Sequence, residues 1–164
     1  MDNIILIGMP GAGKSTVGVL LAKTLGYAFL DTDLVIQQRE GALLQPLVDS
    51  LGVEAFLDVE ADAICSVECR GTVIAPGGSA VCRERAMSHL RALGRIVYLH
   101  LPLEELERRL SNISTRGIAM APGETLADLV ARRAPPYRNY ADLTVDVGRQ
   151  SLEETVALVL RALR

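Results

Sequence analysis

Short apolar segments alternate with longer segments of mixed polarity along most of this chain. Five of the apolar segments have the length of buried strands, and they lie at residues 4–7, 28–30, 72–75, 96–99 and 143–147. Between them, apolar residues recur at the spacing of amphipathic helices, as Val17, Leu21 and Leu25 do after the first segment. Further helices are expected over residues 34–39, 43–51, 53–68, 83–93, 102–110, 125–133 and 151–163. Strands that alternate with helices predict an α/β fold whose parallel sheet is covered on both faces.

The same pattern bears on the organisation of the chain. It contains no repeat, linker or change of composition, so a single domain over residues 1–164 is expected. Residues 111–124 are polar, rich in small side chains and aperiodic, and they form the longest loop candidate. Loops of this length are usually functional or mobile. The charged run at residues 104–109 is interpreted as a solvated helix face.

Composition narrows the class of protein. Hydrophobic residues make up 49% and charged residues 23% of the chain, and no apolar run reaches the roughly 18 residues that a membrane span needs. With a net charge of -3, a basic nucleic-acid-binding surface is not expected. The first residues lack the basic segment of a signal peptide. The chain has three cysteines, an odd number, so we expect reduced thiols in a cytoplasm.

The first expected strand runs into a glycine-rich segment that carries the strongest motif in the chain. Residues 8–15, Gly-Met-Pro-Gly-Ala-Gly-Lys-Ser, match G-x-x-x-x-G-K-[ST], with a strand before and a helix after them. Glycines let backbone N–H groups converge on phosphate oxygens, and the helix N-terminus adds a positive dipole end. In such a loop the lysine reaches the β- and γ-phosphates, the serine hydroxyl holds Mg²⁺, and the following threonine can bond the α-phosphate. The residues expected to bind ATP here are Gly11, Ala12, Gly13, Lys14, Ser15 and Thr16. The motif predicts nucleotide binding without showing what is done with the nucleotide.

Two carboxylates follow the second expected strand, in Asp31-Thr32-Asp33. In open α/β sheets the ligand crevice lies at this carboxyl edge. One carboxylate can orient a water bound to Mg²⁺ while the other accepts a proton from an attacking hydroxyl group. The alternative is that the segment only caps the helix that follows.

Residues 76–79, Pro-Gly-Gly-Ser, follow the third expected strand at the same edge of the sheet. A glycine pair lets a small substrate approach the backbone closely, although a plain turn would have the same sequence. Two arginines, Arg116 in the long loop and Arg133, are candidates for binding phosphate or carboxylate, although a lone arginine is more often a solvated surface charge.

Together and in this order, the motifs resemble the shikimate kinase family, which belongs to the nucleoside-monophosphate-kinase-like P-loop kinases. The resemblance covers nearly the whole chain. It rests on the phosphate loop, Phe29-Leu30-Asp31-Thr32-Asp33, Ala55-Phe56-x-x-x-Glu60, Ala75-x-Gly77-Gly78, Val97-Tyr98-Leu99, Arg116 and Arg133-x-Pro135-x-Tyr137. It implies a three-layer P-loop kinase fold whose five-stranded parallel sheet has the order 2-3-1-4-5. It also implies a substrate-binding helical region near residues 34–62 and a lid near residues 111–124.

The resemblance assigns roles to individual residues. It implies that Lys14, Asp33 and Arg116 are catalytic. Asp33 would contact the substrate hydroxyls and act as the base, and Arg116 would reach from the lid to the ATP phosphates. Ser15 would hold Mg²⁺, with Asp31 in the outer shell of the ion through water. The remaining assignments are Gly77 and Gly78, which line the substrate, Arg133, which clamps the substrate carboxylate, and Gln150, which contacts the adenine region of ATP.

The substrate half departs from the family pattern. The family has an arginine after the phenylalanine of its F-R-x-x-E element, as a ligand of the shikimate carboxylate, whereas this chain has Leu57 followed by Asp58. Loss of such a charge-assisted contact costs about 1.5–3 kcal/mol. Smaller departures are Pro76, Ser79 and Gly117, where the family has threonine, glycine and proline. Either another arginine replaces the missing one, with Arg39, Arg83 and Arg85 as candidates, or the substrate is not shikimate.

These features predict an ATP- and Mg²⁺-dependent kinase that phosphorylates a hydroxyl group of a small metabolite. The resemblance implies conversion of shikimate to shikimate 3-phosphate, in aromatic amino-acid biosynthesis. Leu57 leaves open a related kinase for another hydroxylated metabolite. A nucleotide-binding regulatory module without turnover is a further alternative, which Lys14, Asp33 and Arg116 together disfavour. No partner besides ATP and the small-molecule substrate is expected, and nothing in the sequence requires more than a monomer.

Overall fold

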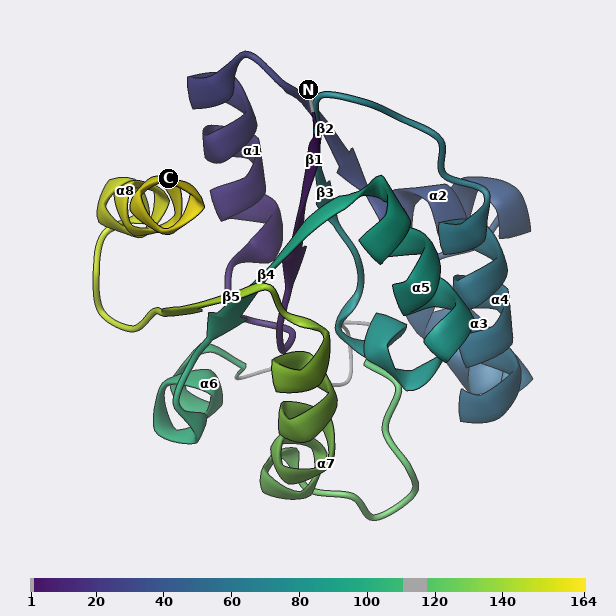
Figure 1. Cartoon of the computed structure of the whole chain (residues 1–164). Coiled ribbons are helices and arrows are strands. Elements are labelled where there is room, and N and C mark those ends of the chain that lie inside the picture. The colour runs from purple at the N-terminus through teal and green to yellow at the C-terminus, as the bar shows by residue number, and fades with distance from the viewer. Residues whose placement is uncertain (1, 111–117) are drawn as a thin grey trace.

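The sheet has the expected topology. The computed structural model describes residues 2–110 and 118–164. Five parallel strands form the sheet in the described residues: β1 (Asn3–Ile7), β2 (Ala28–Asp31), β3 (Thr72–Ala75), β4 (Gly94–His100) and β5 (Leu143–Asp146). Their order is β2-β3-β1-β4-β5, which confirms the order implied by the resemblance. All five residues of the central strand β1 are buried, so the loop that follows it opens from the middle of the sheet (Figure 1).

Helices cover both faces of this sheet. On one side α1 (Lys14–Leu25) and α8 (Leu152–Leu163) pack together, and on the other α5 (Glu84–Leu93) lies against α4 (Val53–Cys65) (Figure 1). Two further helices, α2 (Thr32–Glu40) and α3 (Leu44–Leu51), pack on α4. The remaining described helices are the short 3₁₀ helix η1 (Gly78–Cys82), α6 (Leu103–Arg109) and α7 (Leu126–Tyr140). Within residues 2–110 and 118–164, no helix combines the length and the apolar composition that crossing a bilayer requires.

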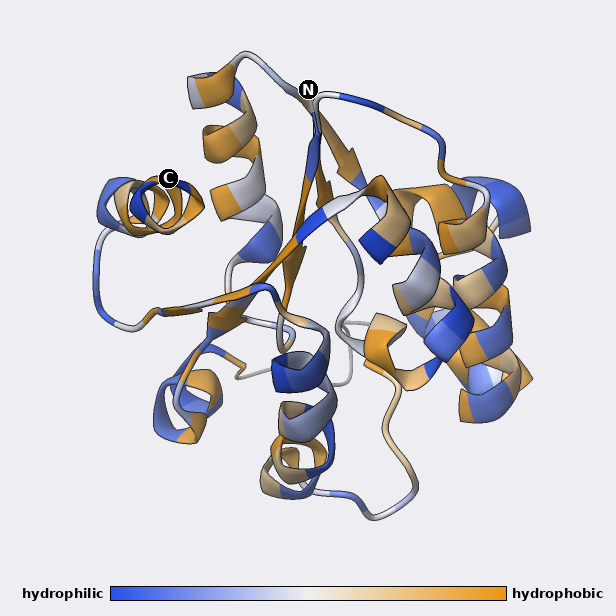
Figure 2. Cartoon of the chain, viewed as in Figure 1, coloured by the Kyte–Doolittle hydropathy of each residue, from blue (hydrophilic) through white to orange (hydrophobic). Residues whose placement is uncertain are grey.

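Buried apolar side chains form two clusters. The main cluster fills the space between the sheet and the helices, and the strands are accordingly coloured as hydrophobic over most of their length in Figure 2. A second, smaller cluster contains Ile36 of α2, Leu47 of α3, and Phe56 and Leu57 of α4. The three helices α2 to α4 therefore have an apolar base of their own beside the sheet, and this base positions the side chains that they direct toward the sheet edge.

The helix α7 is longer than the sequence pattern predicts. It continues to Tyr140, past the end expected at residue 133, although Pro135 and Pro136 lie inside it. Proline has no N–H group and normally interrupts a helix. Tertiary packing outweighs that cost here, because Tyr137 is fully buried and its hydroxyl donates to the carbonyl of Gly78 at 2.5 Å. As a result, Arg133 lies within a continuous helix instead of at its end.

Several other boundaries differ from the expected ones, among them the start of α2 at Thr32 instead of residue 34, and two of the differences have a plain structural cause. The strand β4 begins at Gly94 instead of residue 96, because Gly94 already pairs with Asn3 in the register that β1 imposes. The helix α4 ends at Cys65 instead of residue 68. The hydroxyl of Ser66 there donates to the carbonyl of Ala63 at 2.6 Å, a local bond of the kind that competes with continuation of a helix.

Candidate active site

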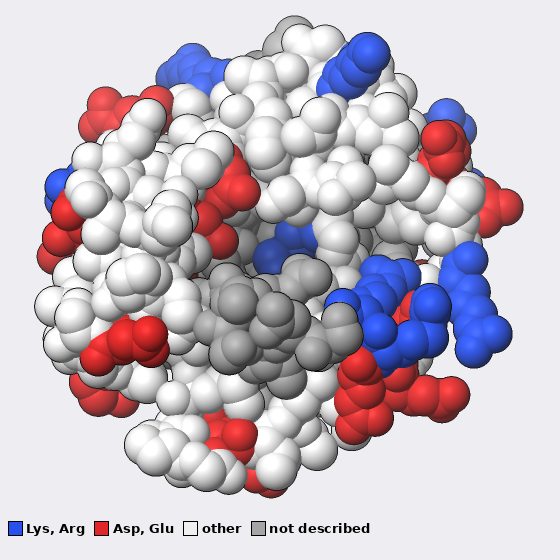
Figure 3. All heavy atoms as spheres, turned by 180° about the vertical axis from the view of Figure 1, so that it is seen from behind, with Lys and Arg blue, Asp and Glu red and all other residues white. Residues whose placement is uncertain are grey.

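Loops at the carboxyl ends of β1, β2 and β3 enclose a cavity of about 430 Å³. In the space-filling view it is a hollow with basic atoms at its depth and acidic atoms along one side (Figure 3). Among the described residues its lining comprises Pro10, Gly11, Gly13, Lys14, Ser15, Thr16, Asp31, Asp33, Phe56, Glu60, Ala75, Pro76, Gly77, Gly78, Ser79, Arg109, Ile118, Ala119 and Arg133. The expected site residues within residues 2–110 and 118–164 all belong to this lining except Ala12 and Gln150. Arg116 lies outside the described residues.

The glycine-rich loop has the backbone that its sequence predicts. Gly11 and Gly13 both have a φ angle of 87°, a left-handed conformation that residues with a Cβ rarely adopt. Gly13 also precedes the first residue of α1, so the amino end of this helix opens into the cavity. This arrangement of backbone N–H groups and helix dipole favours an anion such as a phosphate.

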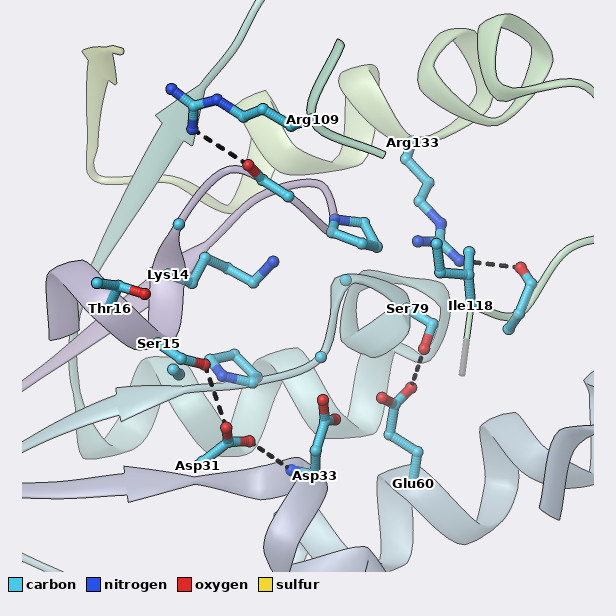
Figure 4. Close-up of a pocket in the computed structure, with 18 of the residues that line it drawn as sticks. Lys14, Ser15, Thr16, Asp31, Asp33, Glu60, Ser79, Arg109, Ile118 and Arg133 are labelled. Carbon is cyan, nitrogen blue, oxygen red and sulfur yellow. Dashed lines mark hydrogen bonds between the residues drawn. The ribbon is translucent and has the colours of Figure 1, made fainter. Parts of the chain in front are cut away.

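Lys14 is folded back over this loop. Its Nζ atom donates to the carbonyl oxygens of Gly8 at 2.8 Å and Met9 at 2.9 Å. Burial lowers the pKa of Lys14 to about 8, because the ammonium group loses water, and the charge of Asp33 opposes this shift. Figure 4 shows the ammonium group in the cavity, on the side of the loop that faces Asp33. It therefore lies where an incoming phosphate would replace backbone carbonyls as its partner.

Asp31 joins the phosphate loop to the start of α2. The hydroxyl of Ser15 donates to Oδ2 of Asp31 at 3.1 Å, and the backbone N–H of Asp33 donates to Oδ1 at 2.9 Å (Figure 4). Asp31 is thus the residue that caps α2, which leaves the carboxylate of Asp33 directed into the cavity. A hydroxyl group beside a carboxylate is a donor set that suits Mg²⁺, which binds proteins through few oxygen atoms and keeps waters and substrate phosphates as its other ligands.

A second acid, Glu60 of α4, stands beside Asp33. Burial raises the pKa of Asp33 to about 6, and the charge of Asp31 adds to the shift while Lys14 opposes it. Glu60 is only 2% exposed, and burial raises its pKa to about 7. A Cβ atom on Gly77 would lie 2.7 Å from Oε2 of Glu60 and 2.9 Å from Oδ1 of Asp33. A side chain at position 77 would push these carboxylates aside, so the glycine lets both of them converge on its backbone.

Arg133 faces these acids from α7. Its side chain is 1% exposed, and its Nη2 atom donates to the carbonyl of Ala119 at 3.0 Å. Its Nε atom has no hydrogen-bond partner among the described residues. A Cβ atom on Gly78 would lie 3.0 Å from Nη1 and 2.7 Å from Cδ of Pro10, so this glycine makes room for the guanidinium. An anion in the cavity would find a buried cation with free donor capacity.

Sequence reasoning missed Arg109 as a site residue. Nε of Arg109 donates to Glu105 at 3.2 Å, and Glu105 is buried, so this part of the charged run is not the solvated helix face that the sequence predicted. The same guanidinium also donates to the carbonyls of Gly11 at 3.2 Å and Gly148 at 2.5 Å, which brings it to the nucleotide end of the cavity. Gln150 lies next to it, in an adjoining recess of about 260 Å³. No local pattern marks Arg109, because its contacts are to residues distant in the sequence.

The missing arginine of the family has not been replaced by the three candidates. Arg83 pairs with Glu54 at 2.8 Å and Asp58 at 2.9 Å, Arg85 pairs with Asp62, and Arg39 is exposed on α2. None of the three lines the cavity. Leu57 is 4% exposed and packs in the cluster below α2 to α4, so it does not line the cavity either. Among the described residues that line the cavity, Arg133 is therefore the arginine on the side of Gly78.

Comparison with known proteins agrees with this arrangement. A family model described as shikimate kinase matches residues 10–164. A shikimate kinase of Pseudomonas aeruginosa is 41% identical over 169 residues, which cover all of this chain and 97% of the relative. A shikimate kinase of Pseudomonas syringae pv. tomato is 38% identical over 99% of this chain and 96% of its own.

Solved structures show the same likeness. A shikimate kinase from Acinetobacter baumannii in complex with shikimate aligns with a TM-score of 0.89 at 30% identity, over 99% of this chain and 93% of that one. The enzyme from Aquifex aeolicus aligns with a TM-score of 0.81, also at 30% identity, over 98% of this chain and 95% of that one. A gluconokinase from Sinorhizobium meliloti, at 23% identity and a TM-score of 0.58, shares the fold alone. With its phosphate loop, its acidic pair and its buried Arg133 assembled around one cavity, the chain belongs to the shikimate kinase family.

Proposed function

We propose that this protein transfers the γ-phosphoryl group of ATP to the 3-hydroxyl group of shikimate. The observation that carries the proposal is the convergence of Lys14, Asp33 and Arg133 on one cavity, from three different elements. These side chains supply a phosphate ligand, a proton acceptor and a carboxylate ligand. A kinase for a hydroxylated carboxylic acid needs all three in one place.

The nucleotide half would bind the phosphates through the backbone of the loop and through Lys14. The ammonium group would exchange the carbonyls of Gly8 and Met9 for phosphate oxygens. Ser15 and Asp31 would hold Mg²⁺, the latter through water, and the ion would supply neutralisation of the phosphate charge. Arg109 and Gln150 border the space beyond the loop, which suits the remainder of the nucleotide. The role assigned to Arg116 stays a prediction.

In the acceptor half, Asp33 would receive the proton of the attacking hydroxyl group. A base works best when its pKa lies near the working pH, and the pKa of about 6 leaves Asp33 mostly ionised at neutral pH. The hydroxyl oxygen then forms the bond to phosphorus while the bond to the bridging oxygen of ADP breaks. Asp33 holds the hydroxyl group in line for this displacement, and most of the catalysis comes from such positioning and from charge neutralisation.

Arg133 would clamp the carboxylate of shikimate. One guanidinium in place of two predicts weaker binding, by about ten- to a hundredfold in KM, from the 1.5–3 kcal/mol of a charge-assisted contact.

We also propose that the protein acts as a monomer in the cytoplasm, where its cysteines stay reduced. In the structure Cys65, Cys69 and Cys82 are free thiols.

The test is an ADP-release assay with ATP, Mg²⁺ and a panel of hydroxy acids that includes shikimate. We expect turnover that depends on shikimate, with the phosphate on the 3-hydroxyl group by NMR, and turnover at least about a hundredfold slower with the matched variant Asp33→Asn. Turnover with another acceptor but not with millimolar shikimate would favour the related kinase, as Leu57 suggests. ATP binding without turnover on any acceptor would favour the regulatory module.

A further inference from the structure

Glu60 is a buried carboxylate to which the mechanism above gives no role. Its Oε1 atom accepts a hydrogen bond from the hydroxyl of Ser79 at 2.6 Å, and both residues are almost fully buried. Figure 4 shows the two side chains pointing toward each other in the lining of the cavity, with Asp33 beside Glu60. A buried carboxylate is costly without donors, and a buried hydroxyl group also needs a partner. The hydroxyl of Ser79 therefore has a partner, and one of the two oxygens of Glu60 has a donor.

The position of Leu57 explains why this pairing matters. Residues three apart on a helix share a face, so residue 57 is the neighbour of Glu60 one turn back along α4. An arginine at position 57, as in the family pattern, would be within reach of the Glu60 carboxylate. Leucine has no donor, whereas Ser79 supplies one where the family pattern has a glycine without a side chain. The two departures from the family pattern, at positions 57 and 79, thus both concern neighbours of Glu60.

We propose that Ser79 is a positioning residue that holds Glu60 as a second carboxylate of the acceptor site, where Glu60 accepts a hydrogen bond from a hydroxyl group of the acceptor that is not phosphorylated. The bond from Ser79 occupies Oε1 and leaves Oε2 over the backbone of Gly77, beside Oδ1 of Asp33. Two acceptor oxygens at this point match an acceptor with two neighbouring hydroxyl groups. This inference rests on the proposed phosphorylation of a hydroxylated acceptor in this cavity.

The charged groups that face Glu60 come from three other elements. They are Asp33 of α2, Lys14 of the phosphate loop and Arg133 of α7. Among the described residues none of them is hydrogen-bonded to Glu60, so the hydroxyl of Ser79 is its one direct donor there. Removal of that hydroxyl group should favour the protonated form of Glu60, because the bond stabilises the ionised form.

The first test compares Ser79→Ala with the wild type in steady-state kinetics. We expect the KM for the acceptor to rise about three- to tenfold, the effect of one hydrogen bond, with the KM for ATP unchanged. In a Glu60→Met background, which has no oxygen to accept the bond, the same change should add nothing, because the two residues act as a unit. Ser66→Ala, which removes a hydroxyl group at the end of α4 outside the cavity, is the matched control and should leave every constant unchanged.

The second test does not depend on the identity of the acceptor. NMR titration of the ¹³C-labelled Glu60 carboxyl group, assigned with Glu60→Gln, should show a higher pKa in Ser79→Ala than in the wild type and in Ser66→Ala. An unchanged titration would overturn the proposal, and so would equal rises of KM for ATP and acceptor, which indicate a general structural defect. A shifted titration together with no turnover on shikimate would retain the Ser79–Glu60 pairing and reject shikimate as the acceptor.

Discussion

Replacement of Arg133 by methionine separates acceptor binding from stability at one buried position. Methionine has a similar length and is flexible enough to fill the space of the aliphatic stem. The variant loses the guanidinium that we propose as the carboxylate ligand. Removal of one partner from a buried, hydrogen-bonded charge pair costs about 2–5 kcal/mol, and a loss of about 3 kcal/mol corresponds to about a 150-fold fall in kcat/KM for shikimate.

The stability of the free protein should hardly change. The variant gives up the hydrogen bond from Nη2 to the buried Ala119 carbonyl and the interaction of the guanidinium with Tyr137. A buried carbonyl that loses its donor costs about 1–3 kcal/mol. It also removes a guanidinium that is 1% exposed and whose Nε atom has no partner among the described residues. Burial of such an unpaired donor costs the wild type about 1–3 kcal/mol, and the variant is relieved of this cost. The two terms are of similar size, so the unfolding midpoint should stay within about 2–4 °C of the wild type, which for a chain of this size corresponds to about 1 kcal/mol.

Thermal unfolding with and without shikimate measures both quantities. At a shikimate concentration 100 times the wild-type Kd, binding stabilises the wild type by about 2.7 kcal/mol. A 150-fold weaker Kd leaves the variant with only about 0.3 kcal/mol at the same concentration. Arg138→Met, an exposed arginine on the same helix, is the control and should respond like the wild type. A wild-type shift in the Arg133→Met protein would refute Arg133 as the carboxylate ligand.

Four further changes test the site. Lys14→Ala should lower kcat about 10²- to 10³-fold, because its charge stabilises the transferring group, and comparable ADP release would contradict this. Asp33→Asn should lower kcat about 10²- to 10⁴-fold with little change in ATP affinity, and a variant that keeps most of its kcat would leave Asp33 a structural role only. Burial raises the pKa of Glu60 from its ordinary value of 4.5 to about 7. Its contribution to the stability of the folded protein is therefore fully present below pH 4.5 and is lost as the pH rises through 7. Glu60→Gln should therefore raise the unfolding midpoint over wild type at pH 8 but not at pH 4, and a constant difference would contradict the assignment. Leu57→Arg should lower the KM for shikimate about tenfold. It should also lower the unfolding midpoint, because it replaces a buried apolar side chain. A higher KM would indicate an acceptor without a carboxylate.

The strands and the phosphate loop could be predicted because their signals are local. A buried parallel strand is a short apolar run, and the loop before α1 needs glycines at fixed positions such as Gly13. The order of the strands was not in the pattern itself and came from the family resemblance. The end of α7 was predicted wrongly, because local rules stop a helix at proline whereas the burial of Tyr137 extends it.

The parts of the site that sequence reasoning missed are long-range contacts. The hydrogen bond between Ser79 and Glu60 joins η1 to α4, and the bond from Arg109 to Gly11 joins α6 to the phosphate loop. Neither segment carries a signal for the other, because such pairs depend on how the helices are arranged around the sheet. Leu57 is the instructive case, because the family resemblance showed that a charge was missing and only the structure showed that the side chain packs in an apolar cluster.

The central place of β1 has a consequence for how the chain folds. The partners of β1 lie far along the chain from it, since Ile4 pairs with Val73 and Ile5 with Ile96. Contacts between residues so far apart in sequence can form only after a large loop has closed, and closure of that loop costs chain entropy. Folding is therefore slower than in proteins built from local contacts. The phosphate loop leaves β1 directly, so it acquires a firm base only when β3 and β4 have docked on either side. During refolding, the ability to bind nucleotide should therefore develop with closure of the sheet and not with formation of α1.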